Sequence, residues 1–102
     1  MNFFQQLFSS KKEDIAAFIS EGALLVDVRT PSEYASGHIK GSVNIPVDTI
    51  PQKLTAFKNQ KHIIVFCRSG NRSAMAKNLL QQNGFNNVVN GGTWTHVNQF
   101  VQ

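Results

Sequence analysis

Two nearly uninterrupted runs of strand-forming residues stand out along this chain. The first spans residues 23–28 and is broken only by Asp27, and the second spans residues 62–66 and ends immediately before Cys67. A strand buried on both faces of a parallel sheet has no polar face, so its sequence does not alternate. The runs therefore predict two central strands with Asp27 and Cys67 at their carboxyl ends. Shorter segments at residues 42–45 and 87–89 predict brief additional strands.

Segments with helical periodicity separate these strands. Residues 10–13 have the Ser-Lys-Lys-Glu sequence of a capping box, and Ile15, Phe18 and Ile19 follow on one helical face before Gly22. Residues 31–34 are predicted to form a short helical turn, and residues 48–57 one helix that is capped by Asp48 and has Pro51 in its first turn. Two more helices are predicted at residues 73–82 and 93–101. Gly91-Gly92 is predicted to form a turn.

The alternation of strands and helices predicts an α/β fold, a single domain with a central parallel sheet and helices on both faces. A chain of 102 residues with 41% hydrophobic content is long enough for one such core and too short for two. We expect residues 10–102 to form the domain and residues 1–9 to be an N-terminal extension that packs on or near it. The apolar residues at the N-terminus lack a cationic start and a cleavage pattern, so we expect a cytoplasmic protein.

The charge pattern narrows the classes of partner. The formal charge of +4 is spread over the whole chain without a basic block, which argues against a nucleic-acid-binding protein and fits a site for a small anion. No run approaches the ~20 apolar residues that span a bilayer, so we expect no membrane partner. The three histidines lack metal-ligand spacing, so neither a metal nor another cofactor is expected.

Cys67 is the only cysteine, and its surroundings make it a candidate nucleophile. It lies between a predicted strand end and a predicted helix start, in the loop Cys67-Arg68-Ser69-Gly70-Asn71-Arg72-Ser73. Gly70 permits a positive φ, so the loop can curl around the sulfur and direct backbone N–H groups toward it. The helix dipole and the two guanidinium groups favour the thiolate in the same way and lower its pKa below ~8.5. With no second thiol in the chain, a covalent intermediate needs an external acceptor.

Taken together, these segments resemble the rhodanese family of sulfurtransferases. The resemblance covers nearly the whole chain from about Ser10 onward, and its specificity comes from the combination of motifs. These are Leu25-Val26-Asp27-Val28-Arg29, Glu33-Tyr34, residues 37–42 (Gly-His-Ile-Lys-Gly-Ser), Asn44-Ile45-Pro46, residues 67–73 (Cys-Arg-Ser-Gly-Asn-Arg-Ser), Gly91-Gly92 and Trp94.

The resemblance implies a two-step transfer of sulfur through Cys67. Cys67 would take a sulfane sulfur from a donor such as thiosulfate, become a persulfide, and pass the sulfur to cyanide, to a small thiol or to a thiol of a protein acceptor. It further implies that Arg68 binds the anionic donor, and we expect Arg72 to brace the loop, through Asp27. Residues 69–71 and Ser73 complete the predicted site.

Other readings of the same residues remain open. A rhodanese-like module without activity, a relay that delivers sulfur to a partner protein, and a small phosphatase or arsenate reductase are the alternatives. Related phosphatases of this fold have one more residue between the cysteine and the arginine. The Cys-x4-Arg spacing here forms a tighter ring, which favours a single sulfur over a phosphoryl group.

Four neighbouring polar residues are expected to have structural roles. Asp27 is predicted to satisfy backbone N–H groups and to orient Arg29 or Arg72. The four-residue spacing of Arg29 and Glu33 predicts a local ion pair between them. His38 is predicted to be held by backbone hydrogen bonds and not to act as a general base.

Overall fold

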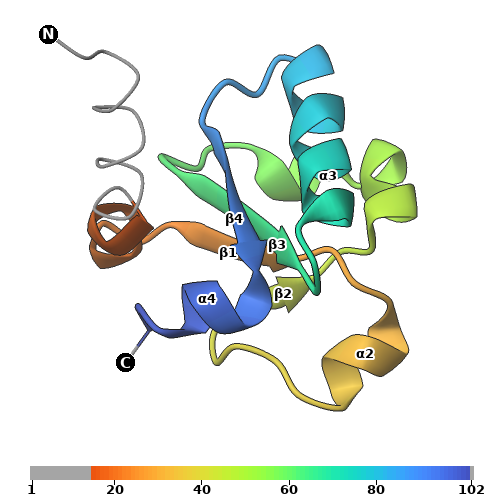
Figure 1. Cartoon of the computed structure of the whole chain (residues 1–102). Coiled ribbons are helices and arrows are strands. Elements are labelled where there is room, and N and C mark those ends of the chain that lie inside the picture. The colour runs from red at the N-terminus through yellow and green to blue at the C-terminus, as the bar shows by residue number, and fades with distance from the viewer. Residues whose placement is uncertain (1–14, 102) are drawn as a thin grey trace, which may run out of the picture.

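The computed structural model describes residues 15–101, which form a four-stranded parallel sheet with helices on both faces (Figure 1). The strand order is β2-β1-β3-β4. Because every neighbouring pair is parallel, all four strands end at the same edge of the sheet. The strands are β1 (Leu24–Asp27), β2 (Val43–Asn44), β3 (Ile63–Cys67) and β4 (Val88–Thr93). The α/β fold predicted from the sequence is confirmed.

The two central strands are those with uninterrupted apolar sequences. All five residues of β3 are buried, and β1 is buried from Leu25 to Asp27. Leu24 pairs with Ile63 and the register continues to the end of β1. These strands have helices above and below them, so neither side has contact with water and neither side needs polar residues.

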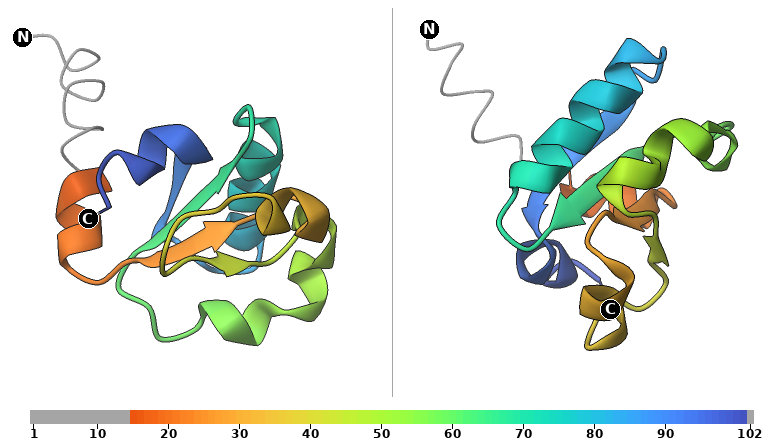
Figure 2. Two further views of the ribbon diagram at one scale, coloured as in Figure 1. Left: turned by 90° about the horizontal axis from the view of Figure 1, so that it is seen from below. Right: turned by 90° about the vertical axis from the view of Figure 1, so that its right-hand side faces the viewer.

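Helical segments cover the two faces of the sheet, as the two perpendicular views make clear (Figure 2). The longest, α3 (Asn71–Gln82), packs on one face together with the 3-10 helices η1 (Val47–Gln52) and η2 (Leu54–Phe57). The helical residues 15–20 and α4 (Trp94–Asn98) pack on the other face around Ile64 and Phe66. A short helix, α2 (Pro31–Ala35), lies beyond the carboxyl ends of the strands (Figure 1).

One predicted helix is wrong in type. Residues 48–57 form two 3-10 helices interrupted at Lys53, and Asp48 does not cap either of them, since η1 follows Pro46 without a side-chain cap. The reason is Pro51, which has no N–H group to donate and disfavours the α conformation at the residue before it. The predicted hydrophobic face persists, because Ile50 and Phe57 are both buried in the core.

The Gly91-Gly92 pair is not a turn but part of β4. Val65 pairs with Asn90 and Phe66 with Gly92, so Gly91 is an extra residue and the strand contains a bulge. A Cβ atom on Gly91 would lie 2.5 Å from Val97 Cγ2, which leaves room only for glycine.

The final helix, α4, is shorter than predicted. The capping box predicted at residues 10–13 and the extension at 1–9 lie outside the described residues. None of the helices described for residues 15–101 is long and apolar enough to cross a membrane.

Candidate functional site

The predicted loop connects the end of β3 to the start of α3. Cys67 is the last residue of β3, and Asn71 is the first residue of α3. Gly70 occupies the N-cap position with φ of +99°, a left-handed conformation that a side chain would strain. No side chain caps this helix, so its first N–H groups remain free to bind another acceptor. The chain therefore turns back over Cys67 within three residues.

The acceptor is the sulfur of Cys67. The backbone N–H of Gly70 donates to Sγ over 3.0 Å, and the hydroxyl oxygen of Ser73 lies 3.5 Å from the same sulfur. The Ser73 hydroxyl also lies 3.0 Å from the carbonyl oxygen of Gly70, and it can donate its single proton either to that oxygen or to the sulfur. A neutral thiol can donate its own proton to the hydroxyl oxygen, whereas a thiolate needs the hydroxyl to donate to it. The geometry accommodates both protonation states of Cys67.

These hydrogen bonds decide the acidity of the thiol. Burial by itself raises the pKa of Cys67, but the hydrogen bonds of the loop outweigh it and bring the pKa below its ordinary value. The donors are the hydroxyl and amide of Ser73 and the amides of Gly70 and Ser69. A thiolate is the nucleophilic form of cysteine, so the loop shifts Cys67 toward the reactive state.

Access to the sulfur is restricted. Cys67 has no exposed surface, and its backbone side belongs to the apolar cluster under α3. The outer rim of the loop is formed by Arg68, Ser69 and Asn71, all of which are exposed. The rim therefore limits access to the sulfur to small groups.

The two arginines of the loop have different surroundings. Arg72 forms a two-point ion pair with Glu33 of α2, with Nη1 to Oε1 at 2.7 Å and Nη2 to Oε2 at 3.1 Å. The hydrogen bonds from Arg72, together with those from Thr30, lower the pKa of Glu33 to about 2, and the pair raises the pKa of Arg72. The expected brace of Arg72 through Asp27 is therefore wrong. Arg68 makes no hydrogen bond or ion pair with any residue of the part of the chain that the structure describes.

Asp27 instead binds Arg29, which is one of the two partners predicted for it. Arg29 Nη2 lies 2.7 Å from Asp27 Oδ2, and the backbone N–H of Arg29 donates to Oδ1 at 3.0 Å. The guanidinium group also donates to the carbonyl of Gly37 and stacks on Trp94 at 4.6 Å from the ring centroid. The predicted Arg29–Glu33 pair is wrong, because this buried network already holds the arginine.

His38 makes the backbone hydrogen bond predicted for it. His38 Nδ1 lies 2.8 Å from the carbonyl oxygen of Tyr34, and the two rings stack with centroids 3.9 Å apart. Tyr34 in turn donates its hydroxyl proton to the carbonyl of Ser42 at 2.6 Å. Within residues 15–101, no three His, Cys, Asp or Glu side chains are grouped closely enough to hold a metal ion.

The bulge in β4 supports the loop from the side of the sheet. A Cβ atom on Gly70 would lie 3.7 Å from the Cα of Gly92, so Gly70 and Gly92 are neighbours in the fold. Gly92 has φ of +82°, and its N–H donates to the side chain of Asn90 at 2.9 Å. The sequence shows the Gly91-Gly92 pair but not the strand that would lie against it, so its link to the site could not be predicted.

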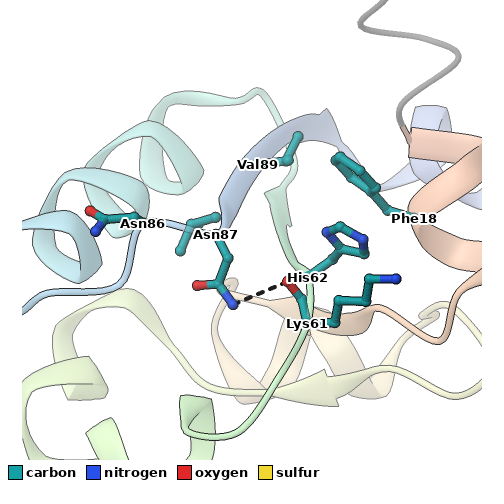
Figure 3. A pocket seen from close by; sticks show the side chains of 7 residues that line it. Phe18, Lys61, His62, Asn86, Asn87 and Val89 are labelled. Atoms are coloured by element: carbon teal, nitrogen blue, oxygen red, sulfur yellow. Dashed lines mark hydrogen bonds between the residues drawn. The ribbon is translucent and has the colours of Figure 1, made fainter.

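A separate cavity of about 330 Å³ lies at the opposite edge of the sheet (Figure 3). Its lining includes Phe18 and His62, whose rings stack at 3.8 Å, and Asn87, whose amide donates to the carbonyl of Gln60 at 2.6 Å. His62 directly precedes β3 whereas Cys67 ends it, so this cavity has no part in chemistry at the cysteine.

Comparison with known proteins connects this geometry to a family. A family model described as a Rhodanese-like domain matches residues 11–93. A sulfurtransferase of Allochromatium vinosum is 38% identical over 71 residues, which are 70% of this chain and 66% of that protein, so the match spans just under two thirds of its length. The thiosulfate sulfurtransferase GlpE of Stutzerimonas stutzeri is 34% identical, with 82% of this chain and 81% of that protein covered.

Solved structures agree with the sequence comparison. The crystal structure of a rhodanese-like domain protein from Staphylococcus aureus superposes with a TM-score of 0.72 at 32% sequence identity, covering 85% of this chain and 86% of that one. A structure described as rhodanese with anions, from E. coli, gives a TM-score of 0.67 at 28% identity, covering 74% of this chain and 91% of that one.

Proposed function

The chain belongs to the rhodanese-like domain family, and from that premise we propose that it is a sulfurtransferase with Cys67 as its nucleophile. The thiolate attacks the outer sulfur of a donor such as thiosulfate. A new S–S bond forms on Cys67 while the S–S bond of the donor breaks, and sulfite leaves with the electron pair. Cyanide or a thiol then attacks the terminal sulfur of the persulfide, whose S–S bond breaks to return the thiolate.

The observation that carries this proposal is the hydrogen bond from the Gly70 N–H to the sulfur of Cys67 at 3.0 Å. It fixes the sulfur at the free N-terminus of α3, where backbone donors and the helix dipole stabilise negative charge. The same donors suit a terminal persulfide sulfur, which is also an anion. Because the chain has no second cysteine, the persulfide cannot be resolved within the molecule and must pass its sulfur to an external acceptor.

Some residues of the loop are suited to binding the anionic sulfur donor, and others maintain the geometry of the loop. Arg68 is exposed and has no carboxylate partner among residues 15–101, so it is available to an anionic donor. Arg72 is already neutralised by Glu33 and braces the loop. Ser69, Gly70 and Ser73 supply the donors around the sulfur, and exposed Asn71 begins α3 at the rim of the site.

The size of the ring argues for sulfur transfer over phosphate hydrolysis. Four residues separate the cysteine from the arginine, and the sulfur has no exposed surface. A phosphoryl group needs donors around three oxygens at once, whereas a persulfide adds a single atom. Misplacing a reacting group by ~1 Å costs about a hundredfold in rate, so a closed ring of this size disfavours phosphoryl transfer.

The decisive experiment is intact mass spectrometry after incubation with thiosulfate. We expect the protein to gain the mass of one sulfur atom, and cyanide to remove it with release of thiocyanate. The Cys67→Ser variant serves as the control and should gain nothing. Hydrolysis of an aryl phosphate without any sulfur adduct would instead identify a phosphatase and refute the proposal.

A further inference from the structure

The Glu33 side chain accepts four hydrogen bonds, two of them from Arg72 of the loop. Its Oε1 accepts from Arg72 Nη1 at 2.7 Å and from the backbone N–H and the hydroxyl of Thr30 at 3.0 and 3.1 Å. Its Oε2 accepts from Arg72 Nη2 at 3.1 Å. One carboxylate therefore joins the start of α2 to the start of α3, two segments separated by 39 residues in sequence.

The α2 end of this link is firmly held. Thr30 and Glu33 form a reciprocal capping box, in which the Thr30 hydroxyl also accepts from the Glu33 N–H. Pro31 follows at the first helical position, where its fixed φ favours the helix. Because β1 ends at Asp27, just before this cap, α2 is tied to the central part of the sheet. Arg72 is thus paired with a residue of a capped helix.

The α3 end of the link is close to the sulfur. Arg72 is the second residue of α3, between Gly70 and Ser73, the two residues that hydrogen-bond to Cys67 Sγ. A shift of the Arg72 backbone would move both donors relative to the sulfur. A hydrogen bond to a charged group weakens steeply when its geometry is lost.

We propose that Glu33 is a positioning residue for the chemistry of Cys67. Through Arg72 it holds the first turn of α3 so that the donors of the loop stay aligned on the thiolate. The inference rests on the proposed function in treating Cys67 as the nucleophile. Glu33 itself makes no hydrogen bond with the sulfur of Cys67 and acts only through Arg72.

A purely electrostatic role for Glu33 makes the opposite prediction. If the carboxylate acted only by neutralising Arg72, its removal would leave an unpaired cation near Cys67 and lower the pKa of the thiol further. If it acts by positioning, its removal lets the donors drift and raises the pKa of the thiol. The sign of the change therefore separates the two roles.

The test is the pH dependence of Cys67 alkylation by iodoacetamide in the Glu33→Gln variant. Glutamine keeps an oxygen at the Oε1 position for Thr30 and Arg72 Nη1, but its NH2 group then faces Arg72 Nη2, so the negative charge and the second contact of the two-point link are lost. We expect the alkylation midpoint to rise by about one pH unit, which corresponds to the loss of roughly one charge-assisted hydrogen bond. The control is Glu21→Gln, which removes a carboxylate paired with Lys61 and His62 at the other edge of the sheet and should leave the midpoint unchanged.

An unchanged or lowered midpoint in folded Glu33→Gln overturns the proposal, even if the melting temperature falls. Should that variant not fold, Arg72→Lys provides the same measurement, because lysine keeps the charge but loses the two-point geometry. Its midpoint should rise by less, and a midpoint at or below that of the wild type overturns the proposal as well. Alkylation does not require sulfur transfer, so this result stays separate from the proposed function, which fails only if wild-type protein forms no persulfide.

Discussion

Replacing Ser73 by alanine removes the one side-chain hydroxyl that contacts the sulfur of Cys67. The hydroxyl lies 3.5 Å from Sγ and 3.0 Å from the carbonyl oxygen of Gly70, and Ser73 has no exposed surface. Water cannot replace the missing group without opening the loop. The substitution changes neither a charge nor the backbone donors, so its effect on the thiol can be attributed to the lost hydrogen bond.

The size of the effect follows from the hydrogen bond that is lost. A hydrogen bond to a charged group contributes about 1.5–3 kcal/mol, and the long contact to sulfur places this one at or below the lower end. One pKa unit corresponds to about 1.4 kcal/mol, so the pKa of Cys67 should rise by about one unit. The thiolate fraction at neutral pH then falls by up to about tenfold, and so should the rate of alkylation.

The assay is the rate of iodoacetamide alkylation as a function of pH, with thermal unfolding measured in parallel. Ser20→Ala is the matched control, because Ser20 donates to the carbonyl of Ala17 three residues earlier, as Ser73 can to Gly70, but at an exposed position far from the sulfur in the sequence. Both variants lose a serine-to-carbonyl hydrogen bond, and only Ser73→Ala should shift the alkylation midpoint. Equal midpoints in Ser73→Ala and the wild type would refute the role given to this hydroxyl.

Three further predictions concern charge, donor binding and packing. The hydrogen bonds of Arg72 and Thr30 lower the pKa of Glu33 to about 2 from 4.5, so the ionised carboxylate stabilises the fold fully above about pH 4.5 and this stabilisation is lost as the pH falls toward 2. Because the pair is partly exposed, it should contribute about 1 kcal/mol to the free energy of unfolding. In denaturant unfolding at a series of pH values, Glu33→Gln should lose less stability than the wild type between pH 4.5 and 2. The same dependence of stability on pH in both proteins would contradict this prediction. Arg68→Gln should raise the KM for thiosulfate about fivefold, the equivalent of about 1 kcal/mol, with the melting temperature unchanged, and an unaffected KM would exclude Arg68 from donor binding. Gly91→Ala should destabilise the fold by about 1–3 kcal/mol in denaturant unfolding, because its Cβ would lie 2.5 Å from Val97 Cγ2, and wild-type stability would show that the bulge can relax.

The sequence predicts most of the fold because the central strands are read from simple apolar runs. The predicted strands at residues 23–28 and 62–66 differ from β1 and β3 by one residue at each end. Asp27 and Cys67 are the last residues of these strands, as expected. The location of the site follows from this, since parallel strands place their carboxyl ends at one edge. The loop could also be predicted, because Gly70 has the positive φ that its position before the helix requires.

The pairing of the charged residues could not be predicted. Arg29 and Glu33 have a spacing that suits an ion pair on a regular helix, but Arg29 lies before the Thr30 cap and its side chain turns toward Asp27. Glu33 is then free to reach Arg72, which is 39 residues away in sequence. A charged side chain often has several possible partners, and the packing of separate elements decides which of them it binds. The spacing of residues within one segment does not contain this information.

The outcome of that pairing determines how the site can attract a donor. Asp27 neutralises Arg29 and Glu33 neutralises Arg72, so the two arginines next to the site serve its architecture. Within residues 15–101, Arg68 is the guanidinium of this edge that remains without a carboxylate. Under the proposed function, long-range attraction of an anionic donor would depend on Arg68, whereas the amides around Cys67 act only at contact distance. We therefore propose that separate groups of the same short loop capture the donor and activate the thiol, so that each role can be altered without the other.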